Sequence, residues 1–277
     1  MQPLDRSAAE SGTQKARGSR RGGVAIIIAL LAVLALFLLP PHGLLDKADR
    51  FAYAVCHRIP GHSFSIGGRQ LPLCARCSGT YLGVLAGIVV LLALGRGRAN
   101  RFPAPKFLVA FAVFMAAWAI DGANSYASFF PGLPQLYEPN NLLRLATGVL
   151  EGLVIAAFVL PLFNMTAWAA TDAQPSIVRW RDLGWLLMGG AVAFGLVVSE
   201  WEPLLYPLAL LSGAMVVLLV GAICVMLVLM IARRDGQAQR WREIAFPLLA
   251  ALAVALAGLA AIGLFRDFLT TWFGLPF

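Results

Sequence analysis

Residues 204–232 read LLYPLALLSGAMVVLLVGAICVMLVLMIA and contain no charged residue. A helix of about 20 apolar residues crosses the roughly 30 Å hydrocarbon layer of a membrane, so this run is long enough to span it. Six further apolar runs occupy residues 23–39, 78–95, 107–125, 141–163, 183–198 and 244–265. The sequence therefore predicts about seven transmembrane helices.

The composition favours the same fold class. Apolar residues make up 60% of the chain and charged residues 13%, whereas soluble domains average about 45–50% and about 25%. None of the runs shows the alternation of apolar and polar residues that a barrel strand requires. We expect an all-α, polytopic helical membrane protein.

The distribution of basic residues predicts the orientation of the chain. Lys and Arg number 22 against 14 acidic residues, for a formal net charge of +8. Of these bases, 15 fall in the N-terminal tail and in segments 96–106, 165–182 and 233–242, which the predicted spans place on one side. Basic loops face the cytoplasm, so we expect a cytoplasmic N-terminus and an external C-terminus in the plasma or inner membrane. Because the excess charge anchors helices and meets lipid, we expect no nucleic-acid partner.

The chain divides into two predicted parts. Residues 1–22 are polar and basic without hydrophobic periodicity, which is typical of a disordered cytoplasmic tail. Residues 23–277 form a helical membrane domain. It includes an external segment rich in Cys and His at residues 41–77, and a short interfacial helix is expected at residues 266–277.

The external segment has its own pattern. Apolar residues recur at helical spacing over residues 44–55, with charged residues between them, which predicts a short helix on the membrane surface. Pro60-Gly61 and Gly67-Gly68 then predict tight turns. These turns can bring the end of the first helix back over a Cys-x-x-Cys pair at residues 74–77.

The cysteines of this segment predict a zinc site. Cys74 and Cys77 are spaced to share a tetrahedral metal, and Cys56 with a histidine completes a Cys3His ligand set. The candidate ligands are Cys56, His57, Cys74 and Cys77, with His62 as an alternative to His57. Neighbouring residues on a helix point about 100° apart, so the helix must end or distort at Cys56 if both Cys56 and His57 bind.

Three other interpretations remain open. The Cys-x-x-Cys pair, with Arg76 between its sulfurs, is also typical of a thiol-disulfide oxidoreductase, here one coupled to a membrane quinone. A structural disulfide fits the oxidising external face equally. Finally, the chain could be a transporter or an accessory subunit in contact with other membrane subunits. The sequence assigns no reaction, so whether the protein is an enzyme stays open.

The same residues resemble a known family. The stretch Cys-x-Arg-Cys-x-Gly-x-Tyr-x-Gly, which follows a Cys-His-Arg triplet, resembles the signature of a bacterial and archaeal family of predicted membrane proteins with a domain of unknown function. The likeness extends over roughly residues 50–160, and it implies a common fold and important positions but no activity. The residues that carry it are Cys56-His57-Arg58, Ser63-Phe64, Gly68, Pro72, Cys74 to Gly83, Asp121-Gly122 and Asn141 to Gly148.

Charged and polar residues inside the spans predict a polar pocket on the cysteine side. Asp121 and Asn124 lie near one end of the third span, and Arg144 and Glu151 share one face of the fourth. Buried charges in a bilayer usually meet one another, so we expect Arg144 to pair with Asp121 or Glu151. In a functional role, Asp121 or Glu151 would accept a proton or support the metal.

Glycines on two spans predict close packing. Gly79, Gly83 and Gly87 lie on one face of the second span, and Gly148 and Gly152 on one face of the fourth. Small residues at this spacing let two transmembrane helices approach closely.

Overall fold

The computed structural model describes residues 43–130 and 132–274, so the predicted tail (1–22) and the first predicted span (23–39) lie outside the described residues. The described chain has seven α-helices and only two pairs of short strands. The α-helices are α2 (Leu44–Val55), α3 (Ala75–Ala93), α4 (Leu108–Ala127), α5 (Asn141–Ala167), α6 (Trp180–Val198), α7 (Leu205–Ile231) and α8 (Trp241–Phe273). The strands are β1 (Ser65–Ile66), β2 (Arg69–Gln70), β3 (Ala99–Arg101) and β4 (Asp172–Pro175), and the 3-10 turns are η1 (Pro60–His62), η2 (Pro105–Phe107) and η3 (Glu202–Leu204).

The predicted membrane fold is confirmed. Six helices, α3 to α8, are long and apolar enough to cross a membrane, and each coincides with one of the predicted runs to within a few residues at the ends, except at the C-terminal end of α8. The short helix expected at residues 44–55 is α2. The separate helix expected at residues 266–277 was wrong, because α8 continues through Arg266 to Phe273. No glycine or proline interrupts residues 264–273, and the helix ends where Gly274 takes a left-handed conformation, with φ 61°.

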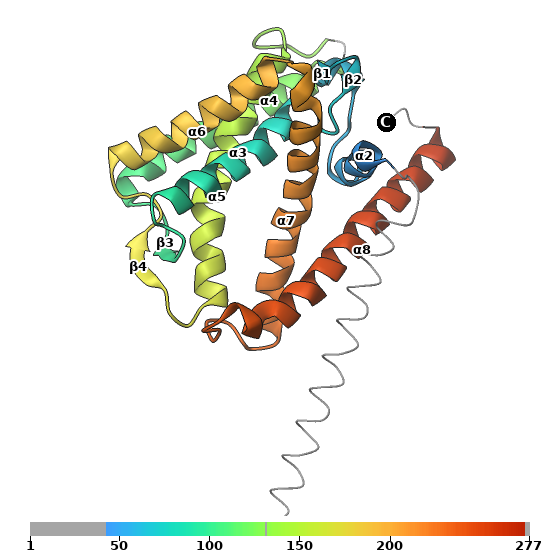
Figure 1. Ribbon diagram of the computed structural model, residues 1–277. Helices are drawn as coiled ribbons and strands as arrows, with labels where there is room; N and C mark the ends of the chain where they lie inside the picture. The colour runs from blue at the N-terminus through green and yellow to red at the C-terminus, as the bar shows by residue number, and fades with distance from the viewer. Residues whose placement is uncertain (1–42, 131, 275–277) are drawn as a thin grey trace, which may run out of the picture.

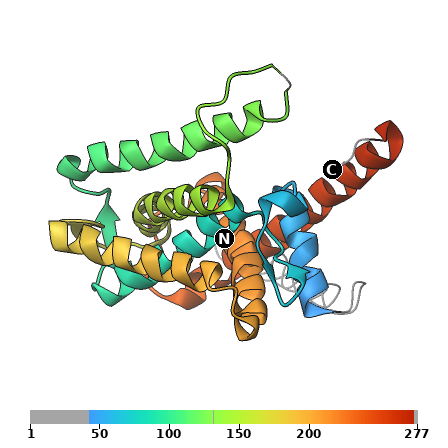
Figure 2. The ribbon, with the colours of Figure 1, turned by 90° about the horizontal axis from the view of Figure 1, so that it is seen from above.

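Helices α4, α6 and α7 pack against the α3–α5 pair, whereas α2 and α8 pack against α7 and each other. Figure 1 shows α3, α4, α5 and α6 on one side of the molecule and α7 and α8 on the other, and Figure 2 shows α4 and α6 on opposite sides of the α3–α5 pair. Helices α3 and α5 run parallel, and both begin at the end of the bundle where α4 finishes. We call this the cysteine end, because α2 and the segment from Cys56 to Cys74 lie there.

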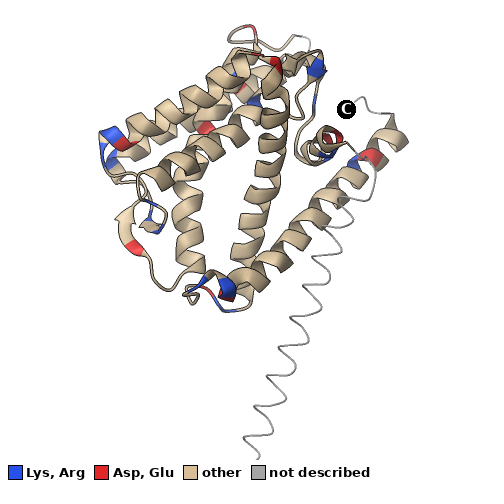
Figure 3. Cartoon of the chain, viewed as in Figure 1, with Lys and Arg blue, Asp and Glu red and all other residues tan. Residues whose placement is uncertain are grey.

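Charge is confined almost entirely to the ends of the helices. Figure 3 shows Lys, Arg, Asp and Glu mainly at helix ends and in connections. At the end opposite the cysteines, strands β3 and β4 pair in parallel and Arg96 forms an ion pair with Asp182 at 3.4 Å. Ionisable residues away from the connections are therefore few, and those at the cysteine end form the site described below.

The tightest helix contact joins α3 to α5, as the glycine rows predict. The backbones touch at Gly79 and Gly83 on α3 and at Gly148 and Gly152 on α5. A Cβ atom at Gly148 would overlap the carbonyl group of Arg76, which belongs to the first turn of α3. The glycines thus fix where this first turn lies.

The contact makes a testable prediction. Gly148→Ala should lower the stability of the detergent-solubilised protein by about 1–3 kcal/mol, because the added methyl group meets backbone that cannot rotate away. Gly195→Ala on α6 is the matched control, since a Cβ there meets nothing within 4 Å. Thermal unfolding of both variants tests this, and equal midpoints would contradict the proposed role of the contact.

Candidate metal centre and polar network

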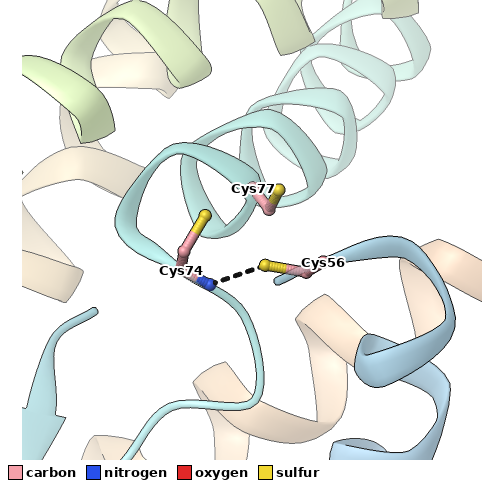
Figure 4. A group of neighbouring side chains, drawn as sticks. All are labelled: Cys56, Cys74 and Cys77. Atoms are coloured by element: carbon pink, nitrogen blue, oxygen red, sulfur yellow. Dashed lines mark hydrogen bonds between the residues drawn. The ribbon is translucent and has the colours of Figure 1, made fainter. Parts of the chain in front are cut away.

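Three cysteines meet at the cysteine end. The sulfur atoms of Cys56, Cys74 and Cys77 all lie within 4.8 Å of one another, although Cys56 comes from the end of α2 and the other two from the start of α3. Figure 4 shows Cys74 and Cys77 on the first turn of α3 with Cys56 beside them. All three are free cysteines, and Cys56 and Cys74 are buried.

The local structure explains how Cys56 reaches the pair. Helix α2 ends at Val55, and Cys56 has an extended backbone with φ −137° and ψ 143°. The helix therefore stops at the residue where the sequence predicted that it must. Among the described residues, the three sulfurs form the close group, and the rings of His57 and His62 lie outside it. The returning chain passes through η1 and the β1–β2 hairpin, and the side chain of Gln70 donates a hydrogen bond to the carbonyl of Arg58 at 3.0 Å.

The sulfur of Cys56 lies in a site that favours a thiolate. The backbone N–H of Cys74, at the N-terminus of α3, donates to it at 3.2 Å, as the dashed line in Figure 4 marks. Hydrogen bonds from the thiols of Cys74 and Cys77, and from the ring of His57, hold the pKa of Cys56 far below its ordinary range. The hydrogen bond from its thiol to Cys56 raises the pKa of Cys74 to about 11. Cys56 is thus the cysteine of the cluster whose surroundings most favour a thiolate.

The two candidate histidines lie next to each other. Nε2 of His57 is 3.4 Å from Nδ1 of His62, and His57 directly follows the ligand candidate Cys56. Burial and the positive charges of Arg144 and Arg76 together lower the pKa of His62 to about 4. His62 is therefore a neutral ring at pH 7 that can exchange a hydrogen bond with His57.

Asp121 is the centre of the polar network. It is 1% exposed and forms its ion pair with Arg76, whose Nε lies 3.2 Å from Oδ2 of the carboxylate. The Tyr137 hydroxyl donates to Oδ1 of Asp121 at 2.9 Å. Burial and this bond raise the pKa of Tyr137 to about 12, so the phenol keeps its proton and remains a donor.

The expected pairing of Arg144 with Asp121 or Glu151 was wrong. Arg144 is 4% exposed, and its Nη1 donates to Oδ1 of Asn141 at 2.8 Å. Within residues 43–130 and 132–274, no carboxylate lies within 4 Å of its guanidinium group. The reason is geometric. The glycine contact brings the first turn of α3 against α5, and Arg76 on that turn then forms the ion pair with Asp121 that was expected for Arg144.

The other predicted pocket residues separate into two groups. Asn124 binds the connection from α4 to α5, since its side chain donates to the carbonyl of Tyr137 at 2.9 Å and accepts from the backbone N–H of Leu136 at 2.7 Å. Glu151 is 9% exposed, and its carboxylate lies 2.6 Å from the hydroxyl of Thr80 on α3. Asp121, Asn124 and Arg144 thus share one network, whereas Glu151 lies in a separate contact.

Sequence reasoning missed three members of the network. It treated Arg76 as a neighbour of the sulfurs, whereas the side chain turns away from them toward Asp121. Ser125 links the two arginines, because its hydroxyl accepts from Nη2 of Arg76 at 3.0 Å and from Nε of Arg144 at 3.4 Å. The charge of Arg76 in the first turn of a span could have indicated a buried ion pair, but nothing in the sequence around Ser125 and Tyr137 pointed to the network.

Comparison with known proteins places the chain in a family. Residues 56–158 match the predicted membrane protein family DUF2085. An uncharacterised protein of Methanocaldococcus jannaschii is 30% identical over 151 residues, which cover 50% of this chain and 90% of that protein. The chain belongs to the DUF2085 family. An uncharacterised protein of Methanothermobacter thermautotrophicus is 33% identical over 107 residues, covering 39% of this chain and 85% of that protein.

The family assignment confirms the resemblance stated from the sequence. The DUF2085 match begins at Cys56 and contains the Cys-x-x-Cys pair, Asp121 and Arg144, whereas α6, α7 and α8 lie beyond it. No solved structure matches this chain.

The network makes a second prediction. Asp121→Asn leaves Arg76 without its counter-charge and should cost about 3–5 kcal/mol, the usual effect of breaking a buried ion pair. Combining Asp121→Asn with Arg76→Gln should cost much less than the sum of the single changes. As the matched control, a second double-mutant cycle combines Asp121→Asn with Arg144→Gln, and the two losses of stability should add more nearly. Thermal unfolding in detergent measures both cycles, and a larger coupling for Arg144 would contradict the pairing.

Proposed function

We propose that this membrane protein binds one zinc ion through Cys56, Cys74 and Cys77, with His57 as the fourth ligand. The observation that carries the proposal is the meeting of three free sulfurs from two separate segments within 4.8 Å. In a tetrahedral site with Zn–S bonds of about 2.3 Å, two sulfurs lie about 3.8 Å apart. The sulfurs need to move by no more than about 1 Å to reach that arrangement.

The surroundings of the sulfurs support zinc as well. Zinc binds thiolates, and Cys56 already has the environment of one. A histidine that binds a metal normally uses its second ring nitrogen in a hydrogen bond to an outer partner. Contact between His57 and His62 would supply that partner to whichever ring binds. We assign His57 as the ligand because its ring also forms a hydrogen bond with Cys56.

We assign the zinc a structural role on the external face. Closed sites of three cysteines and one histidine are typical of structural zinc, whereas catalytic zinc keeps an open position. The ion would join the end of α2 to the start of α3 and add a crosslink to a loop that already buries Ile66, Leu71 and Leu73 in the core. The external position follows from the excess of basic residues at the opposite end of the bundle. Below the zinc, Asp121 and Glu151 remain candidates for proton acceptors.

The zinc itself is the third prediction. Protein purified without chelator should contain about one zinc per chain, and Cys56→Ser, Cys74→Ser or Cys77→Ser should each abolish it. Cys224→Ser is the control, because Cys224 lies on α7 outside the cluster and should leave the metal content unchanged. Elemental analysis measures the metal.

Thiol titration separates zinc from the redox alternative. If zinc is bound, the three clustered thiols should react only after a chelator removes it. Protein without metal that contains a disulfide reducible by dithiothreitol would overturn the zinc proposal and favour a quinone-coupled thiol-disulfide oxidoreductase.

The two histidines give a fourth prediction. His62→Ala removes the outer partner of the ligand and should lower zinc affinity by about 10-fold. His57→Ala removes the ligand itself and should lower zinc affinity by more. Competition against a coloured chelator measures both affinities. The opposite order would make His62 the ligand and refute the assignment of His57.

A further inference from the structure

The C-terminal helix α8 contacts the cysteine site through Arg266. The Nη1 atom of Arg266 donates hydrogen bonds to the carbonyl of Tyr53, at 2.7 Å, and to the carbonyl of Cys56. The Nη2 atom donates to the carbonyl of His57 at 3.3 Å. The guanidinium group also lies over the ring of Tyr53, 4.1 Å from its centre. One side chain thus holds both the last turn of α2 and the two residues that follow it.

These carbonyls need a partner of this kind. The last carbonyls of a helix lack hydrogen bonds within the helix, and a cation at that end interacts favourably with the helix dipole. An arginine has a planar group with five donors, so it can bind several carbonyls at once. Because two of the carbonyls belong to Cys56 and His57, the guanidinium group fixes the backbone of two of the four proposed ligands.

The position of Arg266 in the sequence does not by itself indicate a contact with the cysteine site. Residues 244–265 contain no charged residue, so an arginine that follows them is typical of a membrane anchor at the end of a span. Figure 3 shows that the charges of α8 lie near its two ends. In the structure, however, the guanidinium group is directed to protein carbonyls rather than to the surroundings, as its three hydrogen bonds show.

A second polar link joins the same two helices and touches no ligand. Asp267 forms an ion pair with Arg50 of α2 at 3.1 Å, and both side chains are exposed, at 42% and 60%. Arg266 and Asp267 are therefore neighbours on α8 that both bind α2. Only Arg266 contacts the backbone of the cysteine site, so Asp267 offers a matched control.

We propose that Arg266 is a positioning residue for the metal centre: it holds the backbone of Cys56 and His57 where their side chains meet Cys74 and Cys77. The inference rests on the proposed zinc site. Its consequence is that α8, which lies beyond the DUF2085 match at residues 56–158, takes part in the site. The C-terminal half of the chain therefore tunes a centre whose ligands all come from the matched region.

Zinc and cobalt binding by the full chain test the proposal. R266A should lower zinc affinity by about 10-fold to 100-fold, the usual effect of losing an outer partner of a metal site. It should also shift the visible absorption of the Co²⁺-loaded protein, which reports ligand geometry. R266K should recover part of the affinity, because it keeps the charge at the end of α2 but lacks the planar fork. D267N should match the wild type in affinity and spectrum.

The outcomes separate this inference from the proposed function. If wild-type protein binds zinc and R266A matches D267N in affinity and spectrum, the role of Arg266 is overturned while the zinc site stands. If wild-type protein binds no zinc, the proposed function fails and this inference fails with it. Should R266A not fold, R266K compared with D267N decides: an affinity equal to that of D267N, with an unchanged cobalt spectrum, would overturn the proposal.

Discussion

The close contact of α3 with α5 is the constraint on which the rest of the structure depends. Because Gly148 has no side chain, the backbone of α5 lies against the carbonyl of Arg76 in the first turn of α3. That turn carries Cys74 at its start and Cys77 within it, and it directs Arg76 to Asp121 on α4. Without a hydrophobic driving force between helices in lipid, contact of this kind must come from packing and polar bonds. Here the glycine packing of α3 on α5 determines where the ion pair of Arg76 with Asp121 forms.

Low polarity inside the bundle then decides how the charged residues combine. A buried guanidinium group needs hydrogen-bond acceptors, and a buried carboxylate needs donors. Asp121 accepts hydrogen bonds from two donors, Arg76 and Tyr137, so its charge is compensated at close range. Arg144 obtains two neutral acceptors, the side chains of Asn141 and Ser125. The network therefore joins α3, α4 and α5 at the cysteine end and leaves one positive charge in excess.

The long helices were predictable because an apolar run of about 20 residues crosses a membrane as an α-helix. The short helix at residues 44–55 was predictable because its apolar residues recur at helical spacing. The convergence of Cys56 on the Cys-x-x-Cys pair was also predictable, since Pro60 and the glycine turns allow the chain to fold back. Which arginine reaches Asp121 was not predictable. It depends on how far α3 and α5 slide along each other, and pattern alone does not fix that shift. Arg266 was missed for a similar reason, because its partners are backbone carbonyls 209 to 213 residues away.

The excess charge of the network bears directly on the cysteine cluster. Within this network Arg76 and Arg144 together carry two positive charges against the single carboxylate of Asp121, and their influence reaches the segment between α2 and α3, where they help to lower the pKa of His62. A thiolate at Cys56, which its surroundings favour, offsets that charge in a region of low polarity. A zinc ion bound by three thiolates carries one net negative charge, which has the required sign and lies next to the same turn of α3. The polar network thus favours a negative charge in the cysteine cluster, which one thiolate supplies without metal and three thiolates keep when they hold zinc, although the two sets of residues share no ligand.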